Sequence, residues 1–157
     1  MRLTLHTDYA LRLLTLLALE PDVSHTIEEV ARRYGISRNH LTKVTQTLVQ
    51  AGFVDGQRGR GGGLRLARAA AAINVGAVVR ATEDGFTLVE CFRPEANTCV
   101  LMPACGLAGP LGRALAAFMG VLDGCSLADI AGGPARAERL RGLLAEPAVG
   151  GGGEAAP

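Results

Sequence analysis

Two short helix signals separated by a glycine turn restrict this chain more than any other feature of its sequence. Thr26 and Glu29 form a capping-box pattern, which predicts a helix over residues 27–34, and a glycine follows that helix. Ser37 is a suitable N-cap for a second helix over residues 38–50. Two helices joined by so short a turn are typical of a helix-turn-helix motif. The alternative is a plain helical hairpin with one solvated face.

The second of these helices has an apolar face and a polar face. Leu41, Val44 and Leu48 recur at helical spacing and are expected to pack inward. The N-terminal turns carry the polar set Ser37, Arg38, Asn39, His40 and Lys43. Arg and Lys pair with guanine, and Asn pairs with adenine, through the donors and acceptors of the major groove. We therefore predict that this end of the helix contacts DNA.

A glycine-rich hairpin follows the helix pair. Residues 53–58 and 64–66 predict two strands, and Arg60 lies among four glycines between them. Glycine permits close approach of the backbone to phosphate, and an Arg at the tip suits a narrow minor groove. A nucleotide-binding loop is the alternative, but the chain has no GxxxxGKS or GxxxxGKT pattern. The hairpin is predicted to be the wing of a winged helix-turn-helix domain.

The net charge of +1 conceals an uneven distribution. Residues 1–68 hold ten Lys and Arg against six Asp and Glu, whereas residues 69–157 hold six against nine. Within residues 37–68 six basic side chains are opposed only by Asp55. A basic footprint of this kind favours a polyanion surface, and a solvated face on an Arg-rich chain is the alternative.

Apolar periodicity predicts three further helices, over residues 7–19, 75–82 and 110–122. The last of these places four large apolar side chains on one face, namely Leu111, Leu115, Phe118 and Leu122. Such a face packs within one subunit or forms a twofold dimer interface. A protein that reads palindromic DNA needs a dimer whose half-sites are about 34 Å apart.

Three cysteines lie within residues 90–106, in the spacing Cys-x7-Cys-x5-Cys. They are Cys91, Cys99 and Cys105, in a segment whose prolines predict a loop. Three thiolates suit zinc or an iron-sulfur cluster, and a spacing unlike paired CxxC knuckles favours the cluster. Three unligated thiols are the alternative. Cys125 stands apart, and we expect it to pack in the interior.

Several other classes of protein do not fit the sequence. No apolar run is long enough for a membrane span, and charges interrupt the N-terminal stretch where a secretory signal needs an apolar core. We therefore expect a cytoplasmic protein with reduced thiols and no membrane association. His6, His25 and His40 are scattered, and no catalytic set can be assembled, so we do not expect an enzyme. The end of the chain, EPAVGGGGEAAP, predicts a disordered tail.

Taken together, these features resemble the NsrR-type nitric-oxide-sensing repressors, a group within the IscR-like winged-helix iron-sulfur regulators. The matching stretches are MRLTLHTDYALR, GISRNHLTKV, RGRGGGLRL and the three cysteines, and the similarity covers roughly residues 1–130. The resemblance implies a mainly α fold with a small β-wing. It implies four parts: a winged helix-turn-helix domain (1–82), a cluster-binding loop (83–109), a dimerisation helix with a C-terminal helical segment (110–144) and the tail (145–157).

The resemblance also implies a function and its residues. Cys91, Cys99 and Cys105 become ligands of an iron-sulfur cluster, 4Fe-4S in preference to 2Fe-2S. The DNA surface becomes Ser37, Arg38, Asn39, His40, Lys43, Arg58 and Arg60. The implied protein is a homodimeric repressor of palindromic double-stranded operator DNA, which nitric oxide releases by nitrosylating the cluster so that genes of nitric-oxide detoxification are expressed. The alternatives are an IscR-like sensor of iron-sulfur status and a thiol-based redox regulator.

The fourth ligand of such a cluster is open. IscR-type members have a His three positions after the last cluster Cys, and Ala108 occupies that position here, which favours the NsrR type. Asp8 is our candidate, reaching the cluster of a partner subunit, and Glu90 and His6 are weaker candidates. The alternative role for Asp8 is that of a carboxylate favoured by the positive end of a helix.

Overall fold

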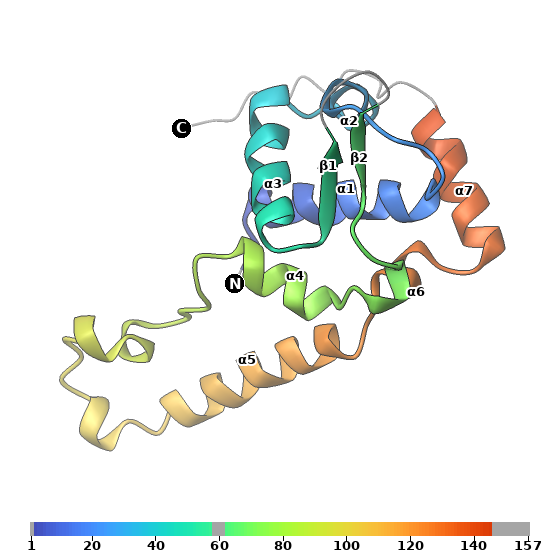
Figure 1. Ribbon diagram of the computed structural model, residues 1–157. Coiled ribbons are helices and arrows are strands. Elements are labelled where there is room, and N and C mark those ends of the chain that lie inside the picture. Colours follow the sequence, from blue (N-terminus) through green and yellow to red (C-terminus); the bar gives the residue numbers. More distant parts are fainter. Residues whose placement is uncertain (1, 58–61, 146–157) are drawn as a thin grey trace.

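The fold is mainly helical with one small antiparallel sheet, as the sequence predicts. We describe it from a computed structural model, which covers residues 2–57 and 62–145. The elements, in chain order, are α1 (Leu5–Leu19), α2 (Ile27–Tyr34), α3 (Arg38–Gln50), β1 (Val54–Gln57), β2 (Gly63–Leu66), α4 (Val75–Thr82), α5 (Ala108–Asp123), α6 (Leu127–Ala131) and α7 (Pro134–Ala145). Figure 1 shows α1 crossing the body of the molecule, with α2, α3 and the hairpin on one side and α4 and α6 on the other.

Local capping contacts fix where the first three helices begin. The hydroxyls of Thr4, Thr26 and Ser37 each accept a hydrogen bond from the backbone N–H three residues later. Glu29 completes the predicted capping box by accepting from the Thr26 N–H at 2.8 Å. Gly35 ends α2 with a φ of 64°, in the left-handed region that glycine adopts without strain. Helix α1 begins two residues before the predicted residue 7 because Thr4 serves as its cap.

One apolar cluster joins the helix-turn-helix to α1. Leu13, Leu14 and Leu16 of α1 are fully buried, and Leu41 and Leu48 of α3 pack in the same cluster. Burial of a side chain of this size contributes about 1.5–3 kcal/mol. The apolar face predicted for α3 is therefore the face that packs on α1.

Strand β2 of the hairpin has a backbone partner on both sides. It pairs with β1 in antiparallel register, and its residue Leu64 forms an isolated bridge to His25, which lies just before α2. The Leu64 N–H donates to the His25 carbonyl at 2.8 Å. A Cβ on Gly63 would lie 2.4 Å from Ser24 Oγ and 3.0 Å from the backbone oxygen of His25, so a side chain here would crowd the bridge. The predicted wing strands are thus present with slightly different ends, while the tip, including Arg58 and Arg60, lies outside the described residues.

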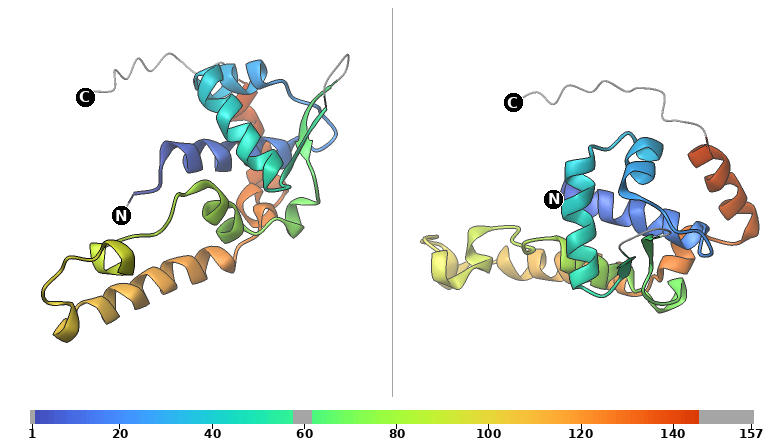
Figure 2. Two further views of the ribbon diagram at one scale, coloured as in Figure 1. Left: turned by 60° about the vertical axis from the view of Figure 1, so that its left-hand side comes forward. Right: turned by 45° about the horizontal axis from the view of Figure 1, so that its top comes forward.

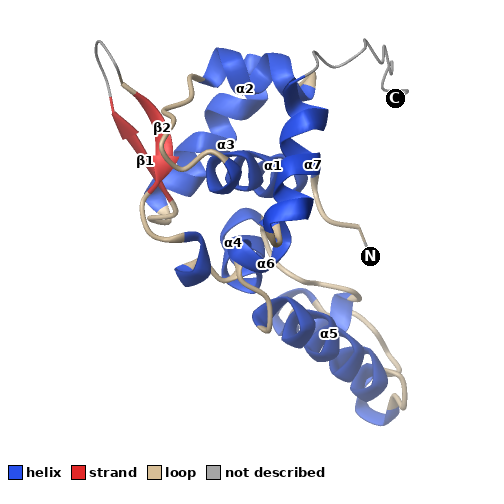
Figure 3. Cartoon of the chain, turned by 90° about the vertical axis from the view of Figure 1, so that its right-hand side faces the viewer, coloured by secondary structure: helices blue, strands red, loops and turns tan. Residues whose placement is uncertain are grey.

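Helix α5 leaves the body, and the chain then returns to it. Figures 2 and 3 show α5 extending away from the other helices, with the cysteine segment near its start. The Leu127 N–H donates to the Ile73 carbonyl at 2.8 Å, and Leu127 is buried in the main cluster. Helices α6 and α7 contact α1. Residues 127–145 therefore share a core with the winged helix-turn-helix, although we expected them to belong with α5. No helix in the described part of the chain has both the length and the apolar character needed to cross a bilayer.

Candidate DNA interface and cysteine segment

The predicted DNA-contacting end of α3 is exposed to solvent. Ser37, Arg38, Asn39, His40 and Lys43 all have exposed side chains. The Ser37 hydroxyl caps the helix by accepting from the His40 N–H at 3.3 Å, and Arg38 forms an ion pair with Glu28 of α2. The side chains of Asn39 and Lys43 form no hydrogen bond or ion pair with the described part of the chain, although the Lys43 carbonyl accepts from the Thr47 hydroxyl. The structure brings these five residues to one end of α3, where a DNA groove can reach them.

Two contacts behind this surface were not foreseen. The Tyr9 ring of α1 lies 6.1 Å from the His40 ring, centroid to centroid. His6, a weaker candidate for the fourth ligand, places Nε2 3.1 Å from the Thr47 hydroxyl of α3. The start of α1 therefore packs directly against the candidate DNA helix. The TDYALR stretch predicts that α1 packs in the core, but nothing in it indicates that α3 is the helix against which it packs.

The basic residues of the hairpin have different roles. Arg65 is exposed on β2, in register with Asp55 on β1. Arg68 donates to the Gly52 carbonyl at 2.8 Å and lies over the Phe53 ring at 5.2 Å, so it supports the end of α3 and the start of the hairpin. Arg58 and Arg60 belong to the tip that the structure does not describe. Both Arg65 and Arg68 are exposed, but Arg68 has its Nε and Nη2 groups bound to the Gly52 carbonyl, whereas Arg65 is open to an external anion.

The cysteine segment consists of three short 3-10 turns, Glu90–Phe92, Pro94–Ala96 and Met102–Ala104. Cys91, Cys99 and Cys105 are half-buried free thiols in or beside these turns. Within residues 2–57 and 62–145, no three His, Cys, Asp or Glu side chains are close enough together to hold a metal ion. The expected gathering of the three thiols is therefore absent from the described conformation. Cys125 is half-buried against the cluster of Val75, Val79 and Met119 rather than fully interior.

The three candidates for a fourth ligand all have partners in the fold. Asp8 accepts from Arg12 at 2.7 and 3.1 Å, one turn along α1. Glu90 accepts from the backbone N–H and the hydroxyl of Thr98 at 2.7 and 2.9 Å, which closes the first part of the cysteine segment. Both views of Figure 2 show that segment projecting away from α1. Within one subunit, Asp8 and His6 are not brought to the cysteines.

A carboxylate at the root of the cysteine segment binds the start of α1. Glu83, directly after α4, accepts from the Thr4 N–H at 2.8 Å and from the Thr4 and Thr7 hydroxyls. Burial raises the pKa of Glu83, but the hydrogen bonds from Thr7 and Thr4 outweigh it and hold the pKa below its ordinary value. Glu83 therefore stays ionised at neutral pH, at the positive end of α1. We call this contact the Glu83 clamp.

The comparisons of the sequence with known proteins all point to one family of transcriptional regulators. Residues 3–133 match the Rrf2 family model, described as an iron-dependent transcriptional regulator. The chain is 52% identical over 131 residues to the HTH-type transcriptional regulator NsrR of Halalkalibacterium halodurans, covering 83% of this chain and 90% of that protein. It is 50% identical over 131 residues to the protein of the same name from Bacillus subtilis, with 83% and 90% covered.

Solved structures share the fold at lower sequence identity. T. potens IscR superposes with a TM-score of 0.65 at 24% identity, over 83% of this chain and 85% of that one. CymR, the global cysteine regulator of B. subtilis, gives 0.65 at 23% identity, over 83% and 96%. These likenesses agree with the winged helix-turn-helix seen here. On its sequence and its architecture, the chain belongs to the Rrf2 family of transcriptional regulators.

Proposed function

We propose that this regulator is a homodimeric repressor that binds palindromic DNA through α3 and the wing, and that it releases DNA when nitric oxide attacks an iron-sulfur cluster. The observation that carries the proposal is the pairing of two features in one chain. An exposed polar helix end lies on one side of the molecule, and a loop with three free thiols projects from another. Relatives that are about 50% identical carry the name NsrR.

The donor set fits an iron-sulfur cluster by its chemistry. Cys91, Cys99 and Cys105 are soft sulfur donors, and none is in a disulfide. Because they are not gathered in the described conformation, ligation requires the 3-10 turns between them to rearrange. When bound, the cluster supplies iron with which nitric oxide reacts. Asp8 of a second copy of the chain is our proposed fourth ligand, and as a hard carboxylate it would be easily displaced from iron.

The residues of the chain itself connect the two sites. Asp8 lies on α1 in the same turns as His6 and Tyr9, which contact Thr47 and His40 of α3. A change in the partner of Asp8 would therefore act on the helix that packs behind the DNA surface. A shift between two arrangements of α1 needs only a differential stability of a few kcal/mol, roughly the scale of other two-state switches.

A dimer through α5 would give the two α3 helices their spacing. Within the described chain α5 packs mainly on α4, and it leaves Val121 68% exposed. The adjoining cysteine segment exposes Val100 and Leu101, at 89% and 68%. Sedimentation of the purified protein should give twice the mass of the chain, and Val121→Lys should shift it toward monomer.

The decisive experiment is anaerobic purification followed by a visible absorption spectrum and iron and sulfide analysis. Cluster absorption should be present in the parent protein and lost in Cys91→Ala, Cys99→Ala and Cys105→Ala, with Cys125→Ala as the matched control that keeps it. Nitric oxide should then release a DNA duplex enriched from a random library by the same protein. A colourless protein with stoichiometric zinc would contradict the cluster.

A thiol-based redox regulator is the second candidate, and the observation that favours it is that Cys91, Cys99 and Cys105 are free thiols with part of their surface open to solvent. It would bind DNA after removal of all iron and would lose or gain affinity with peroxide through a sulfenic acid or disulfide. DNA binding that requires iron would exclude it.

A further inference from the structure

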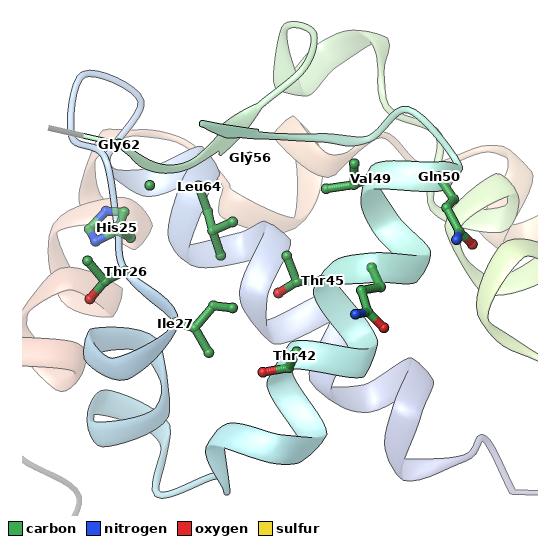
Figure 4. A pocket seen from close by; sticks show the side chains of 12 residues that line it. His25, Thr26, Ile27, Thr42, Thr45, Val49, Gln50, Gly56, Gly62 and Leu64 are labelled. Atoms are coloured by element: carbon green, nitrogen blue, oxygen red, sulfur yellow. The ribbon is translucent and has the colours of Figure 1, made fainter. Parts of the chain in front are cut away.

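A cavity of about 540 Å³ lies between α3 and the hairpin (Figure 4). Its walls come from the residues that lead into α2, from α3 and from both strands of the hairpin. Figure 4 shows Ile27, Thr45 and Leu64 pointing toward one another in its interior, with Val49 close by. A volume of this size falls in the range of about 300–1,000 Å³ that is typical of small-molecule sites.

One buried hydroxyl in this cavity lacks a partner. Thr45 is only 7% exposed, and its Oγ1 forms no hydrogen bond in the described structure. By contrast, Thr42 and Thr47 on the same helix donate to the carbonyls four residues before them, at 2.9 and 3.3 Å. An unsatisfied buried hydroxyl is unfavourable, and a ligand that hydrogen-bonds it removes this penalty. Thr45 therefore indicates where a polar group of a ligand would lie.

The described wall of the cavity carries no formally charged side chain. Among the 12 lining residues in the described part of the chain, none is Asp, Glu, Lys or Arg. His25 also lines it, but burial lowers the pKa of His25, so the imidazole is neutral near pH 7. The His25 Nε2 lies 3.2 Å from Glu20 Oε2 without hydrogen-bond geometry, and it faces that carboxylate. The described wall offers no counter-ion that would replace the hydration of a charged ligand, and it therefore favours a neutral one.

A glycine keeps part of the space open. A Cβ on Gly56 would lie 3.8 Å from both Leu64 and Val49, at ordinary van der Waals distance. Gly56 has no positive φ, so a larger residue there is compatible with the strand. A branched side chain at this position would occupy volume between two lining residues, which makes Gly56 the natural position for a filling variant.

We propose that this cavity binds a small neutral molecule with an apolar, ring-sized body and one hydrogen-bonding group, and that the bound molecule competes with DNA. The competition rests on the proposed DNA surface, because Thr42 and Gln46 of α3 line the cavity on the polar side of that helix. Binding at the cavity does not depend on the metal or on nitric oxide.

The test uses indole, phenol and cyclohexanol as neutral probes and indole-3-acetate as the charged counterpart of indole. The chain contains no Trp, so the fluorescence of indole reports its transfer from water to the cavity directly. Phenol and cyclohexanol are measured by calorimetry. Titration of the full chain without DNA should give saturable binding of at least one neutral probe and much weaker binding of indole-3-acetate. Failure of all three neutral probes to saturate would overturn the proposal.

Two variants and one control locate the site. Thr45→Val keeps the shape but removes the hydroxyl, and it should weaken binding about three- to tenfold, the value of one net hydrogen bond. Gly56→Val should weaken it more by filling space. Thr15→Val is the matched control, since the Thr15 hydroxyl donates to the Leu11 carbonyl on α1, outside the cavity. Circular dichroism checks that each variant folds. Equal affinity of the parent protein and all three variants for the probe would show that the probe does not bind in this cavity.

The last experiment measures the affinity of the protein for DNA in the presence of the probe. At a probe concentration that just saturates the parent protein, the Kd for the enriched duplex should rise at least tenfold in the parent protein and by much less in Gly56→Val. An unchanged Kd in the parent protein would overturn the competition. Loss of DNA binding without any probe would count against the proposed function and not against the cavity.

Discussion

The helix-turn-helix and the cysteine segment are organised in opposite ways. The first is held by caps at the start of each helix and by fully buried leucines from α1 and α3. The second has three short turns, half-buried thiols and apolar side chains open to solvent. Packing holds the helix-turn-helix, with the end of α3 that we propose contacts DNA, in one arrangement. A segment with few buried contacts changes conformation at lower cost. A sensor benefits from this difference, because a ligand shifts the loosely held region first.

The largest expected effect compares a core side chain with an exposed one. Leu48→Ala should lower the free energy of unfolding by about 2–5 kcal/mol, because Leu48 is fully buried on α3. Leu101→Ala, in the cysteine segment, should change it by less than about 0.5 kcal/mol, since that side chain is 68% exposed. Chemical denaturation of both variants measures the difference. Similar losses would mean that the cysteine segment is packed as firmly as the core, against a partner subunit for example.

The next effect concerns the Glu83 clamp, where the two regions meet. Glu83→Ala removes the acceptor of three hydrogen bonds at the start of α1, and we expect a loss of roughly 1–3 kcal/mol in the free energy of unfolding. Asp84→Ala is the matched control, as Asp84 is an exposed neighbour. Because the pKa of Glu83 is lowered in the fold, its stabilisation is present above the ordinary carboxyl pKa and is lost as the pH falls through the folded value. An equal effect of the two variants on the free energy of unfolding would show that the Glu83 clamp does not stabilise the fold.

A smaller effect is expected at the cap of α2. Thr26→Ala breaks the capping box with Glu29 and should cost about 1 kcal/mol of stability. Thr26→Ser should restore most of it, because serine supplies the same acceptor. Thermal unfolding of the two variants gives the comparison. If serine restored nothing, the contribution of Thr26, which lines the cavity, would come from its methyl group.

The smallest effect is a pH dependence at the base of the wing. Burial lowers the pKa of His25, and the positive charge of Arg33 lowers it further. The carboxylates of Glu20 and Glu29 raise the pKa, but not enough to cancel the effect of burial. The unfolded chain therefore takes up a proton at a higher pH than the folded one. The stabilisation should be complete above the ordinary histidine pKa of about 6.5 and should be lost as the pH falls through the lowered pKa of the folded state. Denaturation measured above pH 6.5 and at a series of lower pH values should show a shallower decline in His25→Gln, and an identical decline would assign it to other groups.

The sequence predicted those elements whose signals lie within a few residues. Helices over 27–34 and 75–82 have the predicted ends, because Thr26, Gly35 and Asn74 act through backbone groups three or four positions away. The polar end of α3 followed from the same local reasoning. The cysteine segment was predicted as a loop from its prolines, but its conformation depends on which groups bind the thiols. Spacing alone does not reveal that.

What the sequence determined by itself, then, is helices α1 to α5, the hairpin and the polar end of α3, because capping and apolar periodicity are properties of neighbouring residues. Only the tertiary structure decided the contacts between distant residues. These are the bridge from His25 to Leu64, the clamp from Glu83 to Thr7 and the burial of Leu127 beside α1. Each depends on how helices pack against one another, and no local pattern carries that information. The cavity beneath the hairpin arises from the same packing, since its walls come together only when α2, α3 and the two strands are in place.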